Sequence, residues 1–405
     1  MAKLKPSRKG QTAREKRGNG KNLDRVLPDR PPHRSTPQES GDELALRASA
    51  LLQTAQADEA LPVALKALNL SKKEYKGLRP NVLPTLILLA EIHLELGNAD
   101  EAREYFSQAS QLDSDGLIPE SQGGGVEKFL WLAQLSEEGG KDSVAWFEKA
   151  LTILRKGISS TSEPDSKMQM SKKLAAALCS VVEIYMTDLS WESDAEARCE
   201  SLITEAILIA PESPETLQTL ANVRISQERI DEAKKALADS MALWIALPAS
   251  NESVPDFPTR ISLTRLLMEV DMEKDAMEVL ERLIEEDDTS VEAWYLGGWC
   301  AYLTAERAKA TQKSATNGVD ISCANSLEYE ASLMLSREWL RNSLRLYEMQ
   351  DYEDDRLQNH ATELVHDLDA QLGLAEDEDG DDDAEAEDED WESDSDDGDQ
   401  EMAES

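Results

Sequence analysis

The chain has 405 residues, of which 82 are Asp or Glu and 42 are Lys or Arg, so its formal net charge at pH 7 is −40. Aromatic residues make up only 5% of it, while Ala, Leu and Glu are plentiful, and this composition favours an all-helical protein. So large a negative charge repels nucleic acid, whose backbone is itself negative, and favours a strongly basic partner.

Neither a secretory signal nor a membrane span is expected. The basic N-terminal residues are not followed by an apolar stretch. No run approaches the ~18 uninterrupted apolar residues that a spanning helix needs. Four cysteines are spread along the chain without a CxxC pair, which disfavours a disulfide framework and indicates a reducing intracellular compartment. We therefore expect an intracellular protein without membrane contact.

The first segment is basic. Residues 1–34 carry 11 Lys or Arg and 3 Asp or Glu. A segment with so few apolar residues cannot offset its chain entropy by burial, so residues 1–40 are predicted to form a disordered basic arm. Two roles remain open for this arm: a nuclear import signal, with an import receptor as partner, or a contact with RNA or with the chain's own acidic end.

Residues 88–113 (LLAEIHLELGNADEAREYFSQASQLD) have the pattern of two short amphipathic helices joined at a Gly-Asn corner. Small and bulky residues recur in them at helical spacing: Leu86, Leu89, Ala90 and His93, then Ala102, Phe106 and Ala109. This order resembles the tetratricopeptide repeat (TPR). In that repeat, small residues let two helices approach closely, and large residues fill the space between neighbouring pairs.

The same unit recurs along the chain. Its best copy is PESPETLQTLANVRISQERIDEAKKALADSMAL at 211–243, and the helix before it has matching residues 34 positions earlier. Thr264 and Gly298 occupy the small position of two later first helices, also 34 residues apart. Weaker copies cover 44–70 and 126–154. About seven repeats over residues 41–350 therefore predict an all-α, right-handed TPR solenoid.

Several segments interrupt this array. Residues 115–125 contain GGG, but no strand precedes it and no GK[ST] follows it, so a linker is favoured over a phosphate-binding loop. The Ser-rich stretch 156–171 and the Pro-rich stretch 251–258 are interpreted as connections. Residues 304–330 split the last repeat and are expected to form a helix extension and a mobile segment, with the second helix near 331–347. A polar-faced helix within 351–374 is expected to cap the array.

The last segment is strongly acidic. Residues 376–405 carry 19 Asp or Glu and no Lys or Arg, so residues 375–405 are predicted to form a disordered acidic tail. Two interpretations remain open: a tail that confers solubility, or a flexible polyanion that shields a basic partner from RNA. The second is favoured because the whole chain shares the same sign of charge.

No catalytic, cofactor-binding or metal-binding constellation can be assembled from residue spacing. His93 stands where the repeat pattern expects an aromatic residue, so a packing role is expected. His360 and His366 are six residues apart and lie off a common helical face. No nucleophile elbow and no Ser/His/Asp arrangement is present. A non-enzymatic binding scaffold is therefore expected.

Acidic residues recur at positions that line the inner groove of TPR arrays. They are Glu91, Glu95, Glu137, Glu138, Glu183, Glu215, Glu269 and Glu292. Each exposed ion pair contributes only about 0–1 kcal/mol. Many carboxylates in one concave groove focus the field, however, and bind a Lys/Arg-rich segment in a salt-sensitive way. We therefore predict an acidic partner-binding groove.

Three aromatic residues fall on the same predicted face of a later helix. They are Tyr295, Trp299 and Tyr302, spaced four and three apart. Two interpretations remain open for them: packing between repeats, or a patch of aromatic anchors for a partner.

The repeat array, acidic groove, acidic tail and basic arm together resemble a fungal family, the dedicated assembly chaperones of large-subunit ribosomal protein four. The run DAEARCESLITEAILIAPESPETLQTLANVRISQ at 194–227 looks especially similar to that family, and the resemblance extends over nearly the whole chain. It implies a chaperone that captures the newly made ribosomal protein, shields its long basic loop and accompanies it to nuclear pre-60S particles. Charge and periodicity alone predict only an acidic scaffold for a basic ligand.

Two other binding roles remain open. A scaffold subunit of a multiprotein complex would carry the same repeats. A co-chaperone that clamps the acidic C-terminus of a heat-shock protein needs Lys, Arg and Asn on its inner faces, and Asn222 is the only clear candidate among many acidic residues.

Overall fold

The computed structural model of the chain describes residues 39–77, 79–315 and 324–374. Nearly all of the predicted basic arm, the whole predicted acidic tail and part of the predicted 304–330 insertion lie outside these residues. Within the described residues the structure is entirely helical, with fifteen α-helices, two short 3-10 helices and no strand.

Consecutive helices pair into seven hairpins over the described part of the chain. The pairs are α1 (Gly41–Gln53) with α2 (Ala57–Glu74), α3 (Leu83–Glu95) with α4 (Ala99–Leu112), α5 (Glu127–Gln134) with α6 (Gly140–Ser160), α7 (Pro164–Met186) with α8 (Ala195–Ile209), α9 (Pro214–Ser226) with α10 (Ile230–Ala242), α11 (Phe257–Glu269) with α12 (Glu273–Glu286), and α13 (Val291–Ala315) with α14 (Ala324–Gln350). The 3-10 helices η1 (Pro80–Val82) and η2 (Glu120–Gln122) precede α3 and α5, and α15 (Asp355–Leu372) packs on α14. The predicted all-α hairpin array is confirmed.

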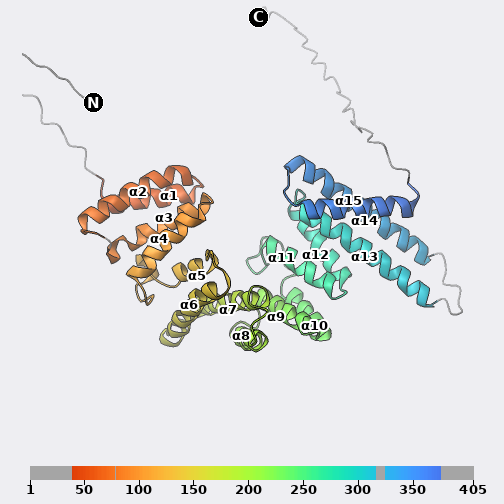
Figure 1. Ribbon diagram of the computed structural model, residues 1–405, viewed down its shortest axis with the longest axis horizontal. Coiled ribbons are helices and arrows are strands. Elements are labelled where there is room, and N and C mark those ends of the chain that lie inside the picture. Colours follow the sequence, from red (N-terminus) through yellow and green to blue (C-terminus); the bar gives the residue numbers. More distant parts are fainter. Residues whose placement is uncertain (1–38, 78, 316–323, 375–405) are drawn as a thin grey trace, which may run out of the picture.

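The hairpins stack into an open arc, with α1 and α2 at one end and α14 and α15 at the other (Figure 1). The odd-numbered helices contact one another across successive hairpins: α1 contacts α3, α7 contacts α9, α9 contacts α11, and α11 contacts α13. From α5 to α11 these helices lie toward the inside of the arc, and their even-numbered partners lie outside (Figure 1). We call α1, α3, α5, α7, α9, α11 and α13 the inner layer.

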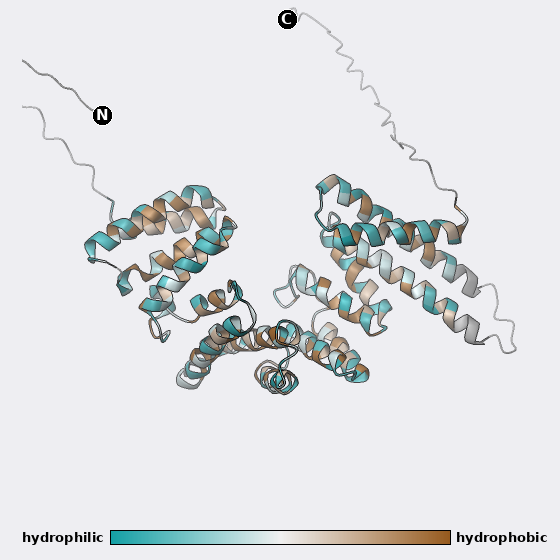
Figure 2. Ribbon diagram, viewed as in Figure 1, coloured by the Kyte–Doolittle hydropathy of each residue, from teal (hydrophilic) through white to brown (hydrophobic). Residues whose placement is uncertain are grey.

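The core is a series of clusters between neighbouring hairpins. One cluster runs from α5 to α9 and the next runs from α9 to α14, and the apolar faces of the ribbons turn toward one another (Figure 2). The predicted small residues Ala90 and Ala102 are fully buried. Phe106 is also buried and stacks on Trp131 of the next hairpin, with 6.1 Å between ring centroids. Small residues thus close each hairpin, and large residues join it to the next one.

Two glycines explain how closely α13 and α14 approach. A Cβ atom on Gly297 would lie 1.9 Å from the Trp339 ring, and one on Gly298 would lie 2.5 Å from Leu340 Cγ. Both distances are too short for any side chain. The Ser336 hydroxyl donates a hydrogen bond to the Gly298 carbonyl at 2.8 Å, which a wider helix spacing would not allow.

Two connections differ from their predicted extents. The Ser-rich stretch 156–171 is mostly helical, contrary to prediction, because α6 runs to Ser160 and α7 begins at Pro164. The Ser160 hydroxyl donates to the Gly157 carbonyl at 3.1 Å, so it bonds within its own helix. The predicted helix extension after residue 304 is present, since α13 continues to Ala315. α14 begins at Ala324, earlier than the predicted 331.

A buried ion pair shapes the segment between the second and third hairpins. Lys128 is fully buried, and its ammonium donates to Asp113 Oδ2 at 2.8 Å and to the Gly125 carbonyl at 2.6 Å. The other carboxylate oxygen of Asp113 accepts from the backbone amides of Leu117 and Ile118 at 2.9 and 3.2 Å. Burial lowers the pKa of Lys128, and the hydrogen bond and charge of Asp113 oppose that shift. The GGG run therefore belongs to a clamped linker.

α15 covers the last hairpin. It buries Leu357, Ala361, Leu364 and Leu368 against α13 and α14. At its N-terminus the Asp354 carboxylate accepts from two backbone amides of the first turn, and at its C-terminus Gly373 adopts a left-handed conformation. The helix thus has a defined start and end. The division into residues 41–350 and 351–374 remains a prediction.

We predict that Lys128→Met destabilises the fold by about 3–5 kcal/mol, because Asp113 is left as an unpaired buried charge. Urea unfolding followed by circular dichroism measures this change. The matched control is Lys141→Met, which removes an exposed ammonium that pairs with Glu192 at 2.6 Å. Equal midpoints for the two variants would contradict the clamp.

Candidate partner-binding surface

Two of the predicted groove residues are exposed but have a carboxyl group that the surrounding protein partly desolvates. Glu91 of α3 and Glu183 of α7 have exposed side chains. Even so, burial by the surrounding protein raises the pKa of each carboxyl, and the nearby charge of Glu127 raises that of Glu91 further. Both residues belong to the inner layer.

The other predicted carboxylates occupy more varied positions. Glu95 and Glu269 are exposed last residues of α3 and α11. Glu215 lies in the first turn of α9, where its carboxylate accepts from the Ser213 hydroxyl at 2.7 Å. Glu292 lies in the first turn of α13 and forms an ion pair with Arg265 of α11. Its charge is therefore partly compensated within the chain.

Glu137 and Glu138 are not on an inner helical face, contrary to the predicted placement. α5 is only eight residues long and ends at Gln134, so both residues lie in the turn before α6. Glu137 pairs there with Arg103 of α4, which also donates to the Leu135 carbonyl at 3.1 Å. The repeat pattern missed this because it assumes a first helix of regular length. Partner binding by these two residues remains a prediction.

The three predicted aromatic residues pack beneath α15. The Tyr295 hydroxyl lies 2.7 Å from His360 Nδ1, and the Trp299 and His360 ring centroids are 5.4 Å apart. Tyr302 joins the same cluster with Leu364 of α15. Of the two roles left open by the sequence, packing is the one seen in the structure. A contact between these rings and a partner remains untested.

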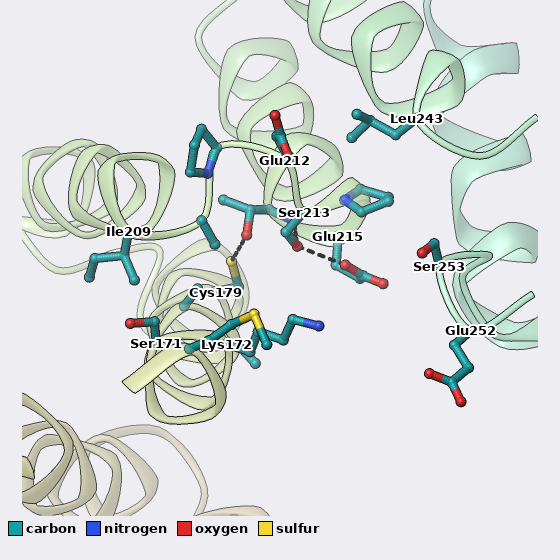
Figure 3. Close-up of a pocket in the computed structure, with 17 residues that line it drawn as sticks. Ser171, Lys172, Cys179, Ile209, Glu212, Ser213, Glu215, Leu243, Glu252 and Ser253 are labelled. Atoms are coloured by element: carbon teal, nitrogen blue, oxygen red, sulfur yellow. Dashed lines mark hydrogen bonds between the residues drawn. The ribbon is translucent and has the colours of Figure 1, made fainter. Parts of the chain in front are cut away.

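A hollow of about 670 Å³ opens between α7 and α9 (Figure 3). Its apolar lining includes Met168, Ala175, Ala176, Ile209, Pro211, Pro214 and Leu243. Three carboxylates line it as well, Glu212, Glu215 and Glu252, together with one ammonium, Lys172. Only Glu215 was a predicted site residue. The hollow is formed by segments from two successive hairpins and the stretch that follows α10, so its lining has no local sequence signature.

Two interactions fix the walls of this hollow. On one side the Cys179 thiol of α7 contacts the Thr216 hydroxyl of α9 at 4.0 Å, which joins the two inner-layer helices (Figure 3). On the other side the Arg282 guanidinium of α12 donates to the backbone carbonyls of Ile245 and Leu247, and it lies 5.4 Å from the Trp244 ring. Arg282 thereby holds the start of the segment that carries Glu252.

Neither a group of metal ligands nor a reactive thiol is found among the described residues. Among them no three His, Cys, Asp or Glu side chains are grouped as metal ligands. Burial raises the pKa of the Cys179 and Cys199 thiols, and it raises that of Cys300 to about 12, so these thiols stay protonated. His93 is buried and stacks on Tyr105 at 5.5 Å, so its predicted packing role is confirmed.

None of the helices in the described segments combines the length and the apolar character that crossing a bilayer requires.

Comparison with known proteins identifies the family. A protein of Emericella nidulans described as a probable assembly chaperone of rpl4 is 51% identical over 366 residues, which are 90% of this chain and 91% of the relative. This chain belongs to the same family. A Schizosaccharomyces pombe member with the same description is 33% identical over 312 residues, covering 76% of this chain and 85% of its own. The fungal family resemblance seen in the sequence is confirmed.

Fold comparisons agree with this family membership. A solved structure named Assembly Chaperone of RpL4 (Acl4), residues 1–338, is 52% identical and superposes with a TM-score of 0.61. It covers 68% of this chain and 100% of that structure's chain. A tetratricopeptide-repeat family model matches residues 43–115, which are α1 to α4 of the present fold. The fold of this chain is thus similar to that of a solved protein with which it shares half of its aligned residues.

The raised pKa of Glu183 predicts a pH-dependent stability difference. In the folded chain this carboxyl keeps its proton to a higher pH than in the unfolded chain, so its contribution to stability falls as pH rises through the raised pKa. Glu183→Gln removes that penalty. The variant should therefore gain stability relative to the parent as pH rises above the range in which an unperturbed carboxyl titrates, by less than about 1 kcal/mol because solvent screens an exposed charge.

Urea unfolding at several pH values measures this difference. Glu95→Gln, which removes one exposed charge at the end of α3, is the matched control. A Glu183→Gln midpoint that moves in parallel with the parent at every pH would show that the surrounding protein does not disfavour the charge.

Proposed function

We propose that this protein is a dedicated chaperone of a newly made basic ribosomal protein, large-subunit protein four (Rpl4). It holds Rpl4 through the exposed carboxylates of its inner layer, shields it from aggregation and from RNA, and escorts it to nuclear pre-60S assembly. The observation that carries the proposal is the 51% identity, over 90% of the chain, to a protein described as an assembly chaperone of rpl4. Binding and release of a protein require no catalysis, so the protein acts as a non-enzymatic scaffold.

The physical basis is charge complementarity on a concave scaffold. The chain carries 40 more negative than positive charges, so it attracts a cationic polypeptide and repels the RNA that competes for it. Exposed carboxylates of the inner layer, such as Glu91 and Glu183, then give local contacts. Each contact is weak in water, but their sum is large and is screened by salt.

The binding of Rpl4 also offsets the unfavourable ionisation of Glu91 and Glu183. Surrounding protein raises the pKa of both carboxyls, and a Lys or Arg placed beside them lowers it again. The two carboxylates therefore favour a cationic partner over water. This preference supports a basic polypeptide as the ligand of the inner layer.

Import and localisation belong to the same proposal. The basic arm, residues 1–40, supplies the nuclear import signal through the 11 Lys or Arg residues of its positions 1–34 and engages an import receptor. The protein accordingly divides between cytoplasm and nucleus. The alternative function, a scaffold subunit of a multiprotein complex, rests on the hairpin array alone. Purification of the tagged protein distinguishes the two, since a dedicated chaperone yields one basic partner in equal amount and a scaffold yields several.

We predict that combined reversal of Glu91, Glu95 and Glu183 to Lys weakens Rpl4 binding by at least about tenfold at about 0.1 M salt, because three contacts become repulsive. The salt dependence of the dissociation constant should also become shallower. Isothermal titration calorimetry at low and moderate salt measures both quantities.

The matched control is Glu104→Lys, Asp239→Lys and Glu285→Lys. These three exposed acidic residues lie on the outer helices α4, α10 and α12, so the control changes the net charge equally. If both triple variants lose the same affinity, net charge alone governs binding. In that case the inner layer is not the binding surface.

A further inference from the structure

The hollow between α7 and α9 has an apolar floor that no described segment of the chain covers. Ala176 lines it and is exposed, and Met168 at the same hollow is 55% exposed although its side chain is large and apolar. Ile209 and Leu243 line it from α8 and from the end of α10, and both are only partly buried. At about 670 Å³ the hollow lies within the range of sites that enclose a compact ligand.

The charged residues around this floor determine which sign of charge an occupant can carry. Three carboxylates line the hollow, Glu212, Glu215 and Glu252, against the single ammonium of Lys172 (Figure 3). The N-terminus of α9 does not turn the hollow into an anion site. The Ser213 hydroxyl already accepts from the Thr216 amide at 3.2 Å and donates to Glu215 at 2.7 Å. An anionic occupant is therefore disfavoured, and a cationic one is favoured.

The apolar floor and the acidic residues of the hollow favour different kinds of side chain in an occupant. The floor gains by removing an apolar side chain from water. Glu212 and Glu252 come from the α8–α9 turn and the α10–α11 segment, and both line the hollow as exposed residues, which we call its rim. Cations there stay hydrated at the surface, where Lys and Arg are stable. A segment that alternates a bulky apolar residue with Lys or Arg satisfies both parts.

We infer that this hollow is an anchoring site for the bound protein, which inserts a bulky apolar side chain between α7 and α9 and places flanking Lys or Arg residues against Glu212 and Glu252. The inference rests on the proposed function, because it takes Rpl4 as the occupant, and it adds a fixed point of attachment. Charge attraction along the inner layer is diffuse and can be satisfied in many registers, whereas one apolar anchor in a shaped hollow selects a single register.

Lys172 limits how strongly the hollow attracts a basic segment. It is exposed, and among the described residues no ion pair to its ammonium is formed. The nearby Lys173, by contrast, pairs with Glu127 at 2.5 Å. Lys172 thus places one positive charge inside an acidic site, and its removal is expected to strengthen binding.

The first test fills the hollow. Ala176→Trp places a large ring on the floor from an exposed helical position, so it blocks the anchor without entering the core. Ala197→Trp on α8 is the matched control, an exposed helical alanine that does not line the hollow. With purified Rpl4 as probe, we expect Ala176→Trp to weaken binding about tenfold and Ala197→Trp to leave it unchanged.

The same titration separates this inference from the proposed function. If the parent protein binds Rpl4 and Ala176→Trp binds it equally well, the anchor is wrong and the chaperone proposal stands. If the parent protein does not bind Rpl4, both fall. Lys172→Glu should tighten binding by up to about fivefold at low salt. Weaker binding by this variant would contradict a cationic flank.

A second measurement avoids any change of fold. A photoreactive benzoylphenylalanine is placed at Lys172, and in a control at Lys235, an exposed lysine of the outer helix α10. Irradiation of the complex with Rpl4 should join position 172 to one peptide, which contains a bulky apolar residue with Lys or Arg within about three positions, a separation of about 10 Å along an extended segment. Products spread over many peptides, or equal products from both positions, would overturn the inference.

Discussion

A helical hairpin in this protein has two apolar sides and by itself can bury only the side between its own helices. The other side must be covered by a neighbouring hairpin, which is why the buried clusters continue from α5 to α9 and from α9 to α14. The same stacking aligns the odd-numbered helices side by side. The faces of these helices that packing does not use form the surface to which a partner has access.

The seven helices of the inner layer carry eleven Asp or Glu and eleven Lys or Arg residues, and these charges differ in kind. Glu91 and Glu183 are exposed and surrounded by protein, so they favour a cation beside them. Glu292 is already paired with Arg265, and Lys172 adds a positive charge to the hollow between α7 and α9. The overall charge of −40 therefore provides long-range attraction, whereas the local pattern determines where a basic segment comes to rest.

The far end of the array shows how a terminal helix completes such a surface. Two contacts hold α15 on α13: Tyr295 forms a hydrogen bond with His360, and the Trp299 ring meets the same His360 ring edge-on. Leu364 and Leu368 of α15 are buried in the same interface. Without this cover the last inner helix would expose its aromatic residues to water. α15 thus ends the array on that side.

The amino-acid sequence by itself determined the hairpin unit, because small and large residues such as Ala90, Ala102 and Phe106 lie within 34 residues and their spacing reflects contacts inside one repeat. It also predicted a partner of positive charge, because composition alone gives the net charge of −40. Only the tertiary structure decided which carboxylates are free, that Glu137 lies in a turn, and that an apolar hollow exists. Those features arise where segments from different hairpins meet, and no local pattern of residues encodes such a meeting.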